Sequence, residues 1–148
     1  VSIFVLTILL SLLLAWIMIQ IKKLRDEERE IWAIKCAEPK PISDETRLRW
    51  EKINKKMESD NQSDWKIAVI EADNLLEEIL IDQKVPGENL GEKLKAMSKE
   101  SLASLDDAWE AHKFRNRIAH DGQIVVDKKE AADALLRFER VFKELEVL

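Results

Sequence analysis

The sequence predicts an all-α protein, with an N-terminal transmembrane helix followed by a bundle of about four main helices. The chain of 148 residues has 3 Gly, 3 Pro and no Tyr, which disfavours a β-sandwich and a glycine-rich phosphate loop. Apolar residues recur at helical spacing after the first 42 residues. Residues 1–21 contain no charged side chain, so all 24 Lys and Arg and all 29 Asp and Glu lie beyond them. The chain is therefore expected to join an apolar head to a charged helical body.

The first 21 residues, VSIFVLTILLSLLLAWIMIQI, predict the membrane segment. Roughly 20 apolar residues cross a bilayer core as a helix. Trp16 lies near one end, and Lys22, Lys23 and Arg25 follow at once. The positive-inside rule then places the N-terminus outside and the body in the cytoplasm, with residues 1–21 in contact with the lipid bilayer. A cleaved signal peptide is the alternative, but its basic n-region and small-residue cleavage site are not visible.

Residues 22–42 are expected to be a juxtamembrane linker, and residues 43–148 the helical domain. Pro39 and Pro41 mark the boundary between them. The linker is either a helix lying on the membrane surface or an extension of the anchor helix. Cys36 is the only cysteine, so a disulfide within the chain is impossible, which suits a reducing cytoplasm.

Two helices are predicted in the first half of the domain. Asp44 is a suitable N-cap for a helix that runs to about Glu58. Ser63 or Asp64 is expected to cap the second helix, which the Val85-Pro86-Gly87 segment ends. The apolar face of the first comprises Trp50, Ile53 and Met57, and that of the second Trp65, Val69, Ala72, Leu76 and Ile79.

Two more long helices are predicted in the second half, after a short one that contains Leu90, Leu94 and Met97. The first runs from about Ser101 to His120 and is stopped by Asp121-Gly122. Asp127 and Glu130 form a capping-box pattern that opens the last helix. Its apolar face comprises Ala131, Leu135, Phe138, Phe142 and Leu145.

The helix over residues 101–120 carries the chemically informative residues. At 100° per residue, one face of this helix falls within an arc of roughly 140°. The first turns place apolar side chains on this face. The last turns place four polar residues on it, namely His112, Arg115, Asn116 and His120. A polar cluster that continues a core-facing stripe is costly unless its members bond one another or a ligand. Asn116 is an i, i+4 neighbour of both histidines, so such bonding is expected.

Phe114 and Ile118 form a second, smaller apolar stripe on the opposite side of this helix. A helix with two apolar stripes is either central in its bundle or packed on another subunit. The stripe is therefore also compatible with a homodimer.

The segment Phe114-Arg115-Asn116-Arg117-Ile118-Ala119-His120 resembles the signature of the HEPN superfamily (higher eukaryotes and prokaryotes nucleotide-binding domain). That signature is an Arg, a polar residue that is often Asn, several further residues and a His, near the end of a helix in an all-α bundle. The stretches WKIAVIEADNLL, GEKLK and WEAHKFRNRIAH also resemble small membrane-anchored bacterial proteins. The resemblance covers roughly residues 45–148.

The resemblance implies an RNA-binding or nucleotide-binding module, or a metal-independent endoribonuclease in which two motifs meet across a homodimer. His120 would act as general base or acid on the 2′-OH or the leaving oxygen. Arg115 would stabilise the charge that develops on the phosphate, and Asn116 would orient the histidine or contact the phosphate. These three are the candidate catalytic residues, and His112, Lys113 and Arg117 are the candidate binding residues.

Structural interpretations of the same residues stay open. His120 would then only interact with the helix C-terminus, Arg115 would pair with Glu71, Asp73 or Glu77, and His112 would be a core histidine. Residues 64–148 hold 13 basic and 19 acidic side chains, whereas RNA binding usually rests on a basic surface. The alternative function is a non-catalytic homodimeric scaffold that holds a protein partner, or a nucleotide-binding module. An antitoxin partner would instead favour a nuclease of toxin type.

Other chemistry has little support in the sequence. Two His and one Cys do not form a recognisable zinc set. The phosphate-loop, G-x-S-x-G and H-E-x-x-H patterns do not occur. No cofactor and no metal is therefore expected.

Overall fold

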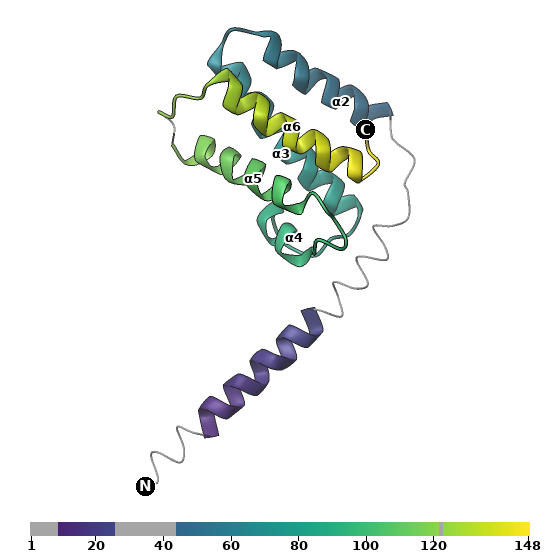
Figure 1. Cartoon of the computed structure of the whole chain (residues 1–148), viewed down its shortest axis with the longest axis vertical. Helices are drawn as coiled ribbons and strands as arrows, with labels where there is room; N and C mark the ends of the chain where they lie inside the picture. Colours follow the sequence, from purple (N-terminus) through teal and green to yellow (C-terminus); the bar gives the residue numbers. More distant parts are fainter. Residues whose placement is uncertain (1–8, 26–43, 122) are drawn as a thin grey trace.

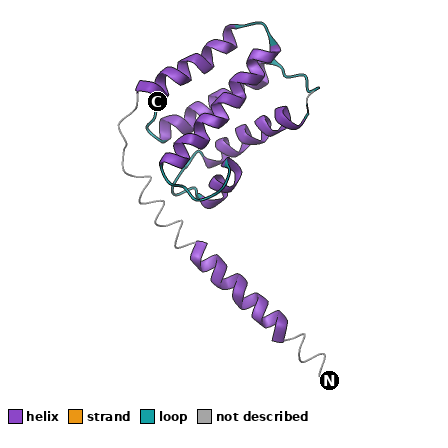
Figure 2. Cartoon of the chain, turned by 180° about the vertical axis from the view of Figure 1, so that it is seen from behind, coloured by secondary structure: helices purple, strands orange, loops and turns teal. Residues whose placement is uncertain are grey.

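The computed structural model describes residues 9–25, 44–121 and 123–148 (Figure 1). Within these ranges every regular element is a helix, and no strand occurs (Figure 2). The predicted all-α class is therefore confirmed for the described chain. After the helix over residues 9–25, the elements are α2 (Asp44–Lys55), the 3-10 helix η1 (Lys56–Glu58), α3 (Gln62–Asp82), α4 (Leu90–Ala96), α5 (Leu105–His120) and α6 (Lys128–Glu144).

The helix α3 is the centre of the bundle. It contacts α2, α4, α5 and α6, which surround it in Figure 1. On α3, Leu76 and Leu80 are completely buried, and Phe138 and Phe142 of α6 are equally inaccessible. The ring of Phe142 lies edge-on to that of Trp50, with 5.2 Å between the ring centroids, which fastens α2 to the core. The apolar faces predicted for α2, α3 and α6 thus meet in one core.

Side-chain caps fix where three of the helices begin. The side chain of Asn61 accepts a hydrogen bond from the Ser63 backbone N–H, so Asn61 caps α3, and the prediction of Ser63 or Asp64 is wrong. Asn89 caps α4 in the same way. The predicted capping box of α6 is confirmed, because the Asp127 and Glu130 side chains both accept from the backbone. Gly122, the predicted stop of α5, lies outside the described residues.

Helix α5 begins four residues later than predicted, and the two backbone N–H groups just before Leu105 are bonded by a side chain of another helix. The Glu144 carboxylate, near the end of α6, accepts from the backbone N–H of Ala103 and, at 2.7 Å, from that of Ser104. Residues 98–101 form a separate turn that is closed by the Ser101 hydroxyl, which donates to the Ser98 carbonyl at 2.8 Å. This bonding keeps the chain out of the helix until Leu105.

The second apolar stripe of α5 is covered by the protein itself. Ile118 is buried, and Phe114 packs against the core. Helix α5 contacts α3, α4 and α6, so it occupies an inner position in the bundle. The stripe therefore gives no argument for a homodimer, which stays a prediction.

The prediction of a single-pass membrane protein is wrong for the described part of the chain. Among residues 9–25, 44–121 and 123–148, no helix is both long enough and apolar enough to cross a bilayer. Among the described residues, the first helical stretch covers residues 9–25 and contains Lys22, Lys23 and Arg25. Residues 1–8 of the expected anchor, and Cys36, Pro39 and Pro41 of the expected linker, lie outside the described residues.

Candidate functional site

The polar residues of α5 meet a buried carboxylate of α3. Asp73 is 1 % exposed and lies one turn before Leu76 on the core-facing side of α3. The His112 Nδ1 atom is 2.8 Å from the Asp73 Oδ1 atom. His112 itself is buried, and its ring lies edge-on to the ring of Trp109. His112, one member of the predicted polar cluster on α5, is therefore bonded, as the cost of burying it requires.

Asn116 and Arg115 close a ring with Asp73 and His112. The Asn116 Nδ2 atom is 3.1 Å from the His112 Nε2 atom, and Arg115 Nη1 donates to Asn116 Oδ1 at 3.0 Å. The Arg115 Nε atom is 3.1 Å from the Asp73 Oδ2 atom. Four side chains from two helices thus form one closed polar network.

The donors and acceptors in this network have a single consistent order. A guanidinium only donates, so Asn116 must turn its Oδ1 atom to Arg115 and its Nδ2 donor to His112. The His112 Nε2 atom must then accept, and the ring proton lies on Nδ1, where it faces the Asp73 carboxylate. The four residues, hereafter the Asp73 network, therefore hold one negative charge on Asp73 and one positive charge on Arg115.

The contact between Arg115 and Asp73 is an ion pair without an aligned hydrogen bond. Asp73 Oδ2 and Arg115 Nε are both buried, yet neither has a hydrogen-bond partner among the described residues. The Arg115 side chain keeps 28 % of its surface exposed, whereas that of Asp73 keeps 1 %. Arg115 is thus anchored at its inner side and reaches solvent at its outer side.

Among the acids considered for Arg115, the structure selects Asp73. Glu71 instead pairs with Lys56, with 3.3 Å between Lys56 Nζ and a Glu71 carboxylate oxygen. The sequence did hold a signal for Asp73: it lies four residues after Val69 and three before Leu76, on the apolar face of its helix. An acid on a buried face needs a partner, and the cations and hydrogen-bond donors of α5 supply it.

His120 lies apart from the Asp73 network. It is the last residue of α5, is exposed, and makes no hydrogen bond or ion pair within the described chain. It follows Asn116 by four residues, so the two residues lie on the same side of the helix. The motif residue with the proposed proton-transfer role is therefore open to solvent.

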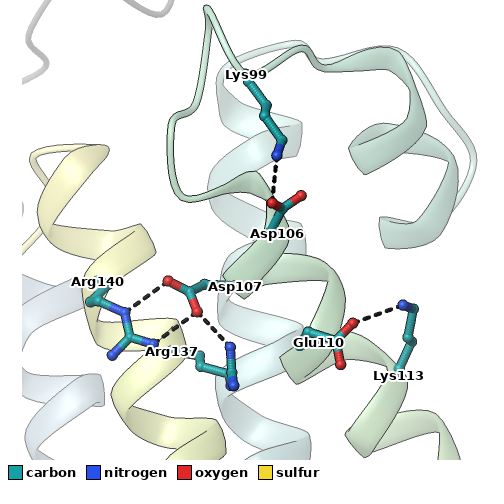
Figure 3. Close-up of polar contacts among 7 residues, drawn as sticks. All are labelled: Lys99, Asp106, Asp107, Glu110, Lys113, Arg137 and Arg140. Atoms are coloured by element: carbon teal, nitrogen blue, oxygen red, sulfur yellow. Dashed lines mark hydrogen bonds and ion pairs between the residues drawn. The ribbon is translucent and has the colours of Figure 1, made fainter.

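The candidate binding residues Lys113 and Arg117 lie on the side of α5 that faces α6. Lys113 pairs with Glu110 at 2.9 Å, as Figure 3 shows, and Arg117 pairs with Glu130 at 3.5 Å. The Arg117 guanidinium also lies over the Phe114 ring, 4.8 Å from its centroid. These residues help to line an open groove of about 330 Å³ between α5 and α6, where acids balance the bases.

An acid and two arginines tie the start of α5 to α6 beside this groove. Asp107 accepts from Arg140 and from Arg137, with the shortest contact at 2.7 Å (Figure 3). The hydrogen bond from Arg140 holds the pKa of the Asp107 carboxyl below its usual value, and Arg137 acts in the same direction. The hydrogen bond from Lys113 likewise lowers the pKa of Glu110. These surface pairs explain the charges near the groove without a ligand.

No metal-binding constellation is present in the described ranges, where His, Cys, Asp and Glu never gather in threes suitable for an ion. Comparison with family descriptions, with curated proteins and with solved structures finds no match to this chain.

Proposed function

We propose that the helical bundle is an RNA-binding module with metal-independent endoribonuclease activity, and that Arg115, Asn116 and His120 form its site. The proposal is supported by the likeness of the Phe114–His120 segment to the HEPN signature within an all-helical bundle. The observation that carries it is the contrast between Arg115, which is anchored by Asp73, and His120, which is exposed and unpartnered within the described chain. A phosphate clamp should be held rigidly, whereas a proton carrier must reach its substrate.

The chemistry follows from the atoms that remain available. Arg115 Nη2 makes no hydrogen bond or ion pair within the described chain, so its two N–H groups can bind phosphate oxygens. His120 takes the proton of the ribose 2′-OH, and the 2′ oxygen attacks the phosphorus. The bond from phosphorus to the 5′ oxygen breaks, and that oxygen takes up a proton from water, to which the protonated His120 returns its proton. The products carry a 2′,3′-cyclic phosphate and a 5′-OH.

The charges around the site limit how RNA is bound. Lys113 and Arg117 are paired with Glu110 and Glu130, so Arg115 is the main cation of the motif that remains for phosphate. Each phosphate neutralised contributes about −0.7 to the salt slope for single strands. One or two neutralised phosphates therefore give a slope of only about −0.7 to −1.4, and we expect recognition of a short RNA segment.

The test incubates the full chain with mixed RNA in EDTA, beside His120→Ala and Arg115→Ala. The matched control is Arg47→Ala, which removes an arginine that is 59 % exposed on α2. We expect the wild type and Arg47→Ala to leave cyclic phosphate ends, and the two site variants to lose cleavage. Equal cleavage by His120→Ala and the wild type would contradict the proposal.

The second candidate function is a non-catalytic interaction module, in which the motif only supports the fold. It is favoured by the ion pair between Arg115 and the buried Asp73, which gives the arginine a structural partner. If the folded wild type neither binds nor cleaves RNA, this interpretation replaces the first. Binding without cleavage would instead indicate an RNA-binding or nucleotide-binding module.

A further inference from the structure

We propose that His112 is a positioning residue for Arg115, that it acts through the Asn116 amide, and that protonation of His112 breaks this link. The sequence motif does not include His112 in the catalytic set, and its burial alone indicates a core residue. The donor order within the Asp73 network gives it a second role. The effect on RNA rests on the proposed function, whereas the coupling inside the network can be measured without RNA.

Asn116 is the link because it makes the only aligned hydrogen bond of Arg115 in the described chain. Arg115 Nη1 donates to Asn116 Oδ1 at 3.0 Å. The contact of Arg115 with Asp73 has no aligned hydrogen bond. Ion pairing fixes the distance of the guanidinium but constrains its rotation weakly, whereas a directed hydrogen bond constrains both. The orientation of Arg115 therefore depends on which way the Asn116 amide points.

His112 determines that direction. With the proton on Nδ1, the His112 Nε2 atom accepts from Asn116 Nδ2 at 3.1 Å, and the amide oxygen is left for Arg115. When Nε2 also carries a proton, two donors face each other. The Asn116 amide then turns by half a rotation to offer its oxygen to His112, and its NH₂ group faces the Arg115 donor. One added proton thus replaces the hydrogen bond on Arg115 by a donor–donor repulsion.

Among the described residues, the groups around the His112 imidazole are few, and only two of them are charged. Within the described chain, its charged neighbours are Asp73 from α3, bonded directly, and Arg115 from α5, reached through Asn116. From α4 it meets the uncharged Gly91, where a Cβ atom would lie 3.5 Å from His112 Nε2. A Cβ atom at that distance would make an ordinary van der Waals contact, and Gly91 brings no charged or hydrogen-bonding side chain to the Nε2 side of the ring.

Two substitutions separate the two contacts of His112. In His112→Gln, the side-chain oxygen can accept from Asn116 in place of Nε2, but it cannot titrate. In His112→Asn, the shorter amide can donate to Asp73 in place of Nδ1, but it does not reach Asn116. The second variant is thus the matched control that keeps the buried Asp73 bonded.

The experiment records ¹⁵N spectra of the histidine ring, the Asn116 amide and the Arg115 guanidinium of the full chain, from about pH 8 to about pH 5. We expect an Nδ1–H ring at high pH, and the Asn116 and Arg115 signals should change together with the second protonation of the His112 ring. In His112→Gln the Asn116 and Arg115 signals should stay constant over this range. Asn116 and Arg115 signals that change independently of the ring, or an Arg115 signal that still changes with pH in His112→Gln, would overturn the proposal.

RNA affinity gives the second readout. At high pH we expect His112→Asn to bind RNA roughly fivefold more weakly than the wild type, because one hydrogen bond on Arg115 is lost, and His112→Gln to bind more tightly than His112→Asn, because its oxygen can still accept from Asn116. Wild-type affinity in a folded His112→Asn would contradict the positioning role. A common NMR midpoint in a protein that does not bind RNA would support the network and reject the proposed function. RNA binding by a protein whose Asn116 and Arg115 signals change independently of His112 would support the proposed function and reject the network.

Discussion

Removing the Asp73 carboxylate is the sharpest test of the network, because two helices meet through it. Asp73→Ala leaves the His112 Nδ1–H group and the inner side of Arg115 without an acceptor. Breaking a buried ion pair by removing one partner costs about 3–5 kcal/mol. The Arg115 side chain is 28 % exposed and gains some hydration, so we expect the lower end of that range, about 3 kcal/mol.

The assay is urea unfolding of the full chain, followed by tryptophan fluorescence. Folded domains are stable by about 5–15 kcal/mol, so a loss of about 3 kcal/mol moves the midpoint visibly. The matched control is Asp133→Ala, which removes an exposed aspartate of α6 that has no ion pair or hydrogen bond in the described chain. Alanine favours the helix more than aspartate does, so this control should change the free energy of unfolding by less than about 0.7 kcal/mol.

A double-mutant cycle isolates the ion pair itself. Asp73→Ala and Arg115→Ala should show a coupling free energy of about 1 kcal/mol or more, because the two groups are in contact. If Asp73→Ala costs less than about 1 kcal/mol, the carboxylate is not a buried anchor and the reasoning is refuted. A full loss without coupling would mean that His112 alone depends on Asp73.

Three further measurements test other parts of the fold. The arginine partners of Asp107 hold the pKa of its carboxyl low, so the carboxylate stabilises the protein above the unfolded-state pKa and loses this effect as the pH falls through the folded-state pKa. In Asp107→Asn, the loss of stability on acidification should therefore be smaller by about 0.5–1 kcal/mol. An unchanged dependence of stability on acidic pH would contradict this. Phe138→Ala empties a fully buried site and should cost about 3–5 kcal/mol in urea unfolding, so a loss near zero would place this ring outside the core. Asp127→Ala removes the N-cap of α6 and should cost about 1 kcal/mol, whereas Asp127→Ser should restore most of it.

Local patterns predicted the helices well because local interactions determine them. The apolar residues of α6 recur at helical spacing, and its capping box lies within four residues, so both were visible in the sequence. The start of α5 was misplaced because Glu144, about 40 residues away, accepts from the backbone N–H groups of the two residues that precede the helix. Such a long-range contact has no local signature. The true cap of α3, Asn61, was missed because several polar residues in a row can each act as N-cap.

Helical spacing predicted which polar side chains of α5 lie together, but not what they contact on the neighbouring helices. Helical spacing alone brought His112, Arg115 and Asn116 together, and the structure shows that these three interact. The same spacing places Lys113 and Arg117 on another side of α5, where Glu110 and Glu130 neutralise them. The choice of Asp73 as the partner of Arg115 required the packing of α3 against α5. Sequence periodicity predicts which residues share one face of a helix, but it does not predict which face the neighbouring helix turns toward it.

His120 is the residue at which the two candidate functions separate most clearly. Asp73, His112 and Arg115 belong to a buried network, so a substitution there changes stability whether or not the protein binds RNA. His120 is exposed at the end of α5, where a histidine contributes at most about 0.3–1 kcal/mol through the helix dipole, and only when it is protonated. His120→Gln should therefore leave the urea midpoint at neutral pH almost unchanged. If it also abolishes RNA cleavage, the loss is chemical, because the fold does not depend on this side chain.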